Sequence, residues 1–78
     1  NIAKLALAAE VDAAIAYITE TAKLKTPSLV MTAAGIGSIE SIHAARIRAA
    51  FNSLGVEMRV VPSAVMSAEN RDLWILKV

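Results

Sequence analysis

The stretch AAGIGS, residues 33–38, is the part of the sequence whose residue types point most directly to chemistry. Glycines let a backbone approach a ligand closely, and free backbone amides at the start of a helix bind phosphate groups. A serine directly after the second glycine adds a hydroxyl group. The stretch therefore predicts an anion site formed by Gly35, Ile36, Gly37, Ser38 and Ile39. A tight turn followed by a serine N-cap is the structural alternative.

Two other kinds of glycine-rich loop do not fit this stretch. A Walker loop requires a lysine after its last glycine, and none is near. A dinucleotide-binding loop requires a third glycine where Glu40 stands, and an acid at the far end of the second strand. Glu57 lies at the near end of that predicted strand. The interpretation that remains is a loop that binds phosphate or sugar oxygens.

Alternating helices and strands are expected around this loop. Residues 2–25 are rich in helix formers, with apolar residues at helical spacing, and Thr26-Pro27 should end this helix. The apolar run of residues 28–35 is typical of a buried strand, and residues 38–55 predict a second helix with Ser38 as N-cap and Gly55 as its stop.

Two more strands are predicted in the rest of the chain, at residues 56–61 and 72–78, with a break at Pro62-Ser63. This order indicates an α/β fold of three layers with a small parallel sheet. The 78 residues should form one domain. Asn1 at the start, in place of Met, predicts a cropped or processed chain.

The segments GIGS and FNSLG, with PSAVMSAENRDLWIL after the second strand, resemble the first half of the sugar isomerase (SIS) fold over residues 28–78. The likeness is to arabinose-5-phosphate isomerase-like and glucosamine-6-phosphate synthase-like domains. It implies a truncated module that binds a phosphorylated sugar through Gly35, Gly37 and Ser38. Catalytic residues of an isomerase would lie largely outside this chain, and none is assigned here. A self-associating structural module and a sugar-sensing regulatory domain are the alternatives.

The composition of the chain argues against some classes of binding partner. A net charge of +1 without a basic stripe argues against nucleic acid, and no apolar run approaches the length of a membrane span. Because 56% of the residues are apolar in so short a chain, we expect a homo-oligomer. The absence of cysteine fits the cytoplasm, and no cofactor is predicted.

The remaining polar and aromatic side chains have simpler interpretations. His43 is the only histidine, and no second histidine or cysteine accompanies it, so no metal site is predicted. We expect His43 to have a structural role or to lie at an interface. Arg46, Arg48, Glu57 and Arg59 should be solvated or interfacial charges, and Met66 and Trp74 core or interface residues.

Overall fold

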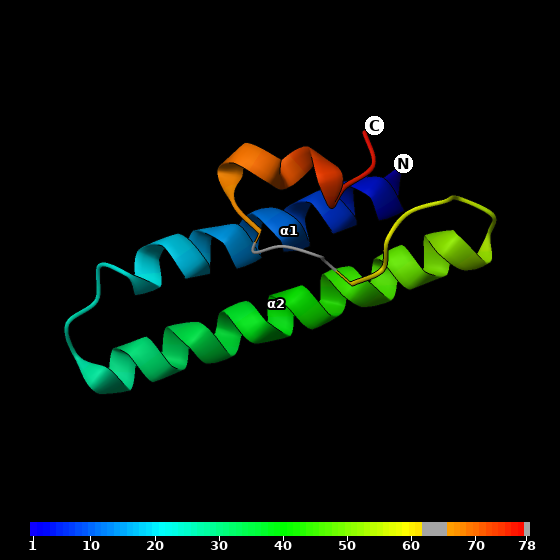
Figure 1. Ribbon diagram of the computed structural model, residues 1–78. Coiled ribbons are helices and arrows are strands. Elements are labelled where there is room, and N and C mark those ends of the chain that lie inside the picture. Colours follow the sequence, from blue (N-terminus) through cyan, green and yellow to red (C-terminus); the bar gives the residue numbers. More distant parts are fainter. Residues whose placement is uncertain (62–65, 78) are drawn as a thin grey trace.

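The chain folds as an antiparallel pair of long helices with a shorter segment packed beside them (Figure 1). The computed structural model describes residues 1–61 and 66–77. Helix α1 comprises Ile2–Thr21, helix α2 comprises Pro27–Ser53, and a 3₁₀ helix, η1, comprises Ala68–Leu73. The hairpin is elongated, with a longest extent of 44 Å.

Helix α1 confirms the first predicted helix, although it ends at Thr21, a few residues earlier than expected. Its buried residues are Leu7, Val11 and Ala14, which follow one another at four- and three-residue spacing and so form a stripe along one side. Ile18, the next large apolar residue at this spacing, is 44% exposed. The stripe therefore covers the first two thirds of the helix, which is the part that the C-terminal segment packs against.

Helix α2 contradicts the prediction of a strand at residues 28–35. Thr26 is extended, with φ −88° and ψ 120°, and Pro27 occupies the first turn of one continuous helix. Proline suits that position because its fixed φ is already helical and its missing N–H is not needed there. An eight-residue apolar run fits a buried strand and a helix equally well, so the proline was misread as a strand boundary.

Gly35 and Gly37 consequently lie inside a helix. A Cβ atom at Gly37 would lie 3.2 Å from the Cβ of Tyr17 on α1, whereas one at Gly35 would meet nothing. Gly37 therefore permits close approach of the two helices. The glycine that does adopt a positive φ is Gly55, at 91°, directly after the end of α2, as the sequence predicted for the helix stop.

Residues 56–61 and 72–77 are not strands. Within the described parts of the chain no strand occurs, and the second of these segments begins with the last two residues of η1. A capping box starts η1, because the Ser67 and Asn70 side chains each accept a hydrogen bond from the other's backbone amide. The predicted break at Pro62-Ser63 and the end of the last predicted strand, Val78, lie outside the described residues.

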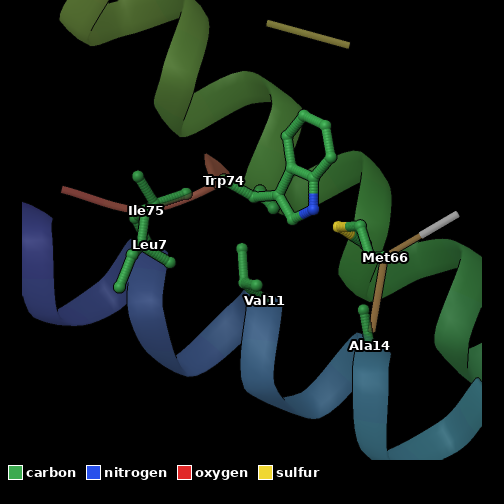
Figure 2. Packing of buried hydrophobic residues seen from close by; sticks show 7 residues of the cluster. Leu7, Val11, Ala14, Met66, Trp74 and Ile75 are labelled. Atoms are coloured by element: carbon green, nitrogen blue, oxygen red, sulfur yellow. The ribbon is translucent and has the colours of Figure 1, made fainter. Parts of the chain in front are cut away.

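The hydrophobic core lies between the hairpin and the C-terminal segment (Figure 2). Trp74 and Ile75 face Leu7 and Val11 of α1, and Met66 lies near Ala14. The Trp74 Nε1 donates a hydrogen bond of 3.0 Å to Asn70 Oδ1, so its polar atom is satisfied within the core. The prediction that Trp74 and Met66 are core residues is confirmed.

Arg48 anchors the C-terminal segment to α2. Its side chain is fully buried, with Nε donating to the Val60 carbonyl at 2.8 Å and Nη1 donating to the Trp74 carbonyl at 3.1 Å. Burial lowers the pKa of Arg48 from its ordinary value, but a guanidinium group remains charged in proteins. The prediction of a solvated or interfacial Arg48 is therefore wrong.

Two further bonds hold the segment from 56 to 77. Asn52 Nδ2 donates to the Met58 carbonyl at 2.8 Å. Arg71 forms a two-pronged ion pair with Asp12 of α1, and its hydrogen bonds lower the pKa of the Asp12 carboxyl. The Nη1 of Arg71 also lies 3.6 Å from Oδ1 of Asp72. The segment is thus tied to both helices.

The predicted three-layer α/β architecture with a parallel sheet is wrong, because the described residues form helices and irregular connections and no strand. The fold consists instead of the helical hairpin and the C-terminal segment that packs against one side of it. No helix in the described ranges is long and apolar enough to span a lipid bilayer.

Candidate metal centre

The five residues predicted to bind an anion lie in the middle of α2. Their amides belong to a continuous helix, and the Ser38 hydroxyl donates to the Ala34 carbonyl at 2.8 Å. The loop with free amides therefore does not exist. Ligand binding by Gly35, Ile36, Gly37, Ser38 and Ile39 stays an untested prediction, but the structural basis on which it was made is wrong.

A different group of side chains meets on the hairpin. Glu10 of α1 and Glu40 and His43 of α2 each contribute a possible ligand atom, and these atoms all lie within 4.8 Å of one another. The Nδ1 of His43 lies 3.5 Å from Oε1 of Glu10. The side chains of His43 and Glu10 are 48% and 26% exposed, so the cluster lies at the surface with Glu10 as its more buried member.

The hairpin itself explains why these three residues meet. Glu40 and His43 are three residues apart, which places them one turn apart on the same face of α2. Glu10 lies at the midpoint of α1, and the antiparallel packing of the helices brings it opposite that turn of α2. A loop of only five residues, 22–26, joins the helices and sets their register.

The closeness of two carboxyl groups in the cluster changes the pKa of one of them. A hydrogen bond between the Glu40 and Glu10 side chains raises the pKa of Glu40, with partial desolvation and the Glu10 charge adding to the effect and His43 opposing it. The Oε2 of Glu10 is buried and has no hydrogen-bond partner. Such an orphaned carboxylate oxygen is an unusual cost in a native structure, and it requires an explanation.

A bound cation explains these features together. A cation would coordinate the orphaned Glu10 oxygen and offset the repulsion between the Glu10 and Glu40 carboxylates. Carboxylate oxygens with an imidazole nitrogen suit iron, manganese and zinc better than they suit soft copper(I). The donor set of the cluster therefore fits a divalent transition metal.

Sequence reasoning missed this cluster because it searched for a second histidine or cysteine. The available signal was the pattern Glu40-x-x-His43, one turn apart on a helix, with a glutamate on the preceding amphipathic segment. That pattern gains meaning only when residues 27–53 form one helix antiparallel to α1. The mistaken strand at residues 28–35 separated Glu10 from Glu40 and hid the pattern.

A family model described as a ferritin-like domain matches residues 1–53, which comprise α1, the connecting loop and α2. No curated protein and no solved structure matches the chain significantly. The matched family is helical, so the resemblance to the sugar isomerase fold is wrong, and the function of a phosphosugar-binding or isomerase module is overturned with it. The chain belongs to the ferritin-like domain family.

Proposed function

We propose that this chain binds a divalent transition-metal cation through Glu10, Glu40 and His43, as one half of a dinuclear carboxylate centre. The observation that carries the proposal is the meeting of the three ligand atoms within 4.8 Å, on two helices of a ferritin-like hairpin. Among the described residues, this is the group of potential ligands that the fold brings together.

The distribution of the ligands over the helices supports a half-site. Ferritin-like di-iron and di-manganese proteins place a glutamate on each of two helices and a Glu-x-x-His pair on each of two others, all pointing into a four-helix bundle. Here α1 carries a single glutamate and α2 carries the Glu-x-x-His pair. One hairpin thus supplies one copy of each element, and a second helical pair would complete the set.

The three residues have different tasks in this proposal. Glu10 supplies its unpaired Oε2, and Glu40 supplies its carboxylate in the deprotonated form. His43 binds as a neutral imidazole through one ring nitrogen. A bound iron or manganese ion supplies one-electron redox chemistry, which none of the side chains of this cluster provides alone. The role of the chain is to hold the cation and to exchange protons with solvent as it binds.

Cobalt(II) titration tests the proposal, because coordination by carboxylate and imidazole changes its visible absorption. We expect saturable binding to the parent chain and to Glu20→Gln, a control on the exposed end of the same helix. Glu10→Gln and Glu40→Gln should each weaken binding at least tenfold. Equal binding by all four chains would refute the assignment.

The pH dependence gives a second readout of the same site. Because the metal displaces a proton from Glu40, affinity should fall as the pH is lowered through the raised pKa of that residue. The dependence should be weaker in Glu40→Gln, which has no carboxyl proton to release at that position. A pH-independent affinity in the parent would show that Glu40 is not a ligand.

We also place the protein in the cytoplasm, a location supported by its cysteine-free sequence. The predicted absence of nucleic-acid and membrane partners stays a prediction.

A further inference from the structure

Each helix of the hairpin carries a second stripe that the C-terminal segment leaves uncovered. We call this surface the open seam. Its members follow alternating three- and four-residue spacing, which is the spacing of residues at a helix-to-helix contact in coiled coils and bundles. They are Ala3, Ala6, Glu10, Ala13 and Tyr17 on α1, and Ile36, Glu40, His43, Ile47, Ala50 and Leu54 on α2 and its C-cap.

The open seam is apolar except at the metal cluster. None of its members is fully buried, and Leu54 is 81% exposed. The C-terminal segment directs its bonds elsewhere, to Asp12 on α1 and to Arg48 and Asn52 on α2. An apolar stripe of this length, interrupted only by ligands, is the surface that a helical bundle buries.

The shape of the open seam is complementary to itself. On α1 the seam is mostly alanine, whereas on α2 it carries the larger Ile36, Ile47 and Leu54. A hollow of about 190 Å³ is lined by Phe51 and by four members of the open seam, Ala3, Ile47, Ala50 and Leu54. If α1 of one chain packs against α2 of another, large side chains meet small ones and a protruding side chain can enter each hollow.

The negative charges of the glutamates determine whether two open seams can associate. Two copies bring together four glutamates, and like charges this close oppose association. Two divalent cations carry the four positive charges that balance them, while the two histidines bind in the neutral form. A cation would therefore both complete the site and permit the contact.

We infer that the open seam is the interface for a second copy of this chain, and that divalent metal binding drives formation of the homodimer. The inference rests on the proposed metal site. Each protomer contributes Glu10, Glu40 and His43 to a centre shared by the two copies. The other side of the hairpin is already covered by Met66, Trp74 and Ile75.

Sedimentation equilibrium with and without cobalt(II) tests the inference. Excess EDTA should give the monomer of 8.2 kDa, and saturating cobalt should give twice that mass with one ion bound per chain. A coupling of the usual size would change the dimer dissociation constant about 5–150-fold. Visible absorption recorded on the same samples reports metal binding separately from mass.

Two neighbouring alanines supply a matched pair of variants. Ala50 and Ala49 are both exposed on α2, but Ala50 lies on the open seam and Ala49 does not. Ala50→Glu should remain monomeric with cobalt present, whereas Ala49→Glu should dimerise like the parent. Circular dichroism confirms that both variants keep the helical fold, so a failure to dimerise cannot be attributed to unfolding.

The outcomes separate the two proposals. Cobalt binding that depends on Glu10 and Glu40 without any increase in mass would overturn the dimer and leave the metal site intact. A dimer in EDTA that cobalt does not strengthen would overturn the linkage between metal and association. Absence of glutamate-dependent cobalt binding would overturn the metal site itself and the inference with it.

Discussion

The two long sides of the hairpin hold buried charge in different ways. On the side covered by the C-terminal segment, Arg48 is fully buried and two of its nitrogens donate to backbone carbonyls, while its Nη2 has no partner. On the open seam, the Oε2 of Glu10 is also buried without a partner, and a hydrogen bond between the Glu10 and Glu40 side chains raises the pKa of Glu40. The difference is that Arg48 is bound to the backbone of the chain, whereas the unpaired Glu10 oxygen lies among three possible metal ligands.

The residues that stabilise the fold and the residues that could bind a metal lie on different sides of the hairpin. The covered side contains the core residues, and the open seam contains the residues that could do chemistry. Substitutions on the covered side should therefore destabilise the chain, and substitutions of the acidic residues on the open seam should not.

The largest effect is expected for Trp74→Ala. Trp74 is 3% exposed and packs against α1 through Leu7 and Val11. Its truncation should lower the free energy of unfolding by about 3–5 kcal/mol, as measured by urea unfolding with circular dichroism. Leu73→Ala is the control, because Leu73 is 66% exposed on the adjacent position. Equal effects of the two variants would contradict a core formed by the C-terminal segment.

Arg48→Met tests whether the buried guanidinium anchors that segment. The variant keeps an apolar side chain of similar length but leaves the carbonyls of Val60 and Trp74 unpaired. We expect a loss of about 2 kcal/mol in the free energy of unfolding. Arg46→Met, at an exposed position of the same helix, should have little effect. A more stable Arg48→Met chain would mean that the desolvation of the charge outweighs its hydrogen bonds.

Glycine substitutions test the continuous helix α2 that brings the open seam together. Gly35→Ala should stabilise the chain by about 0.5–1 kcal/mol, because the new methyl group meets nothing and alanine favours a helix. Gly37→Ala should gain less or lose stability, since its Cβ would press on Tyr17. Thermal unfolding of both variants distinguishes this helix from a glycine loop, in which Gly35→Ala would be unfavourable.

The smallest effect is expected at the acidic cluster in the absence of metal. A raised pKa means that the folded chain holds the Glu40 proton more firmly than the unfolded chain does. The stability of the parent should thus decrease as the pH rises from about 4.5, the ordinary Glu value, through the raised value. Glu40→Gln should abolish this decrease and melt slightly higher at neutral pH. A lower melting temperature for metal-free Glu40→Gln would show that Glu40 serves the fold.

Local patterns predicted part of this fold. The apolar spacing and helix formers of residues 2–25 identified α1, and Gly55 identified the end of α2. The aromatic and sulfur-containing side chains of Trp74 and Met66 were placed correctly in the core. These features depend on neighbouring residues or on the strong tendency of large apolar side chains to be buried, and both are readable in one sequence.

The errors came from positions where short-range rules permit two answers. Pro27 can end one element or begin a helix, and Gly35 and Gly37 can form a loop or allow two helices to approach. Choosing the loop removed the second long helix, and the metal cluster depends on that helix. Arg48 was misplaced because its partners, the carbonyls of Val60 and Trp74, are 12 and 26 residues away.

The way in which the C-terminal segment is held has an evolutionary consequence. Arg48 and Asn52 bind the backbone carbonyls of residues 58, 60 and 74, and every amino acid supplies such a carbonyl. Residues 58 and 60 can therefore change type during divergence without loss of the bonds that they accept, provided that the backbone path is kept. Arg48 and Asn52 have no such freedom. Among homologues we expect position 60 to vary faster than Arg48 and Asn52, which bind the backbone of the segment.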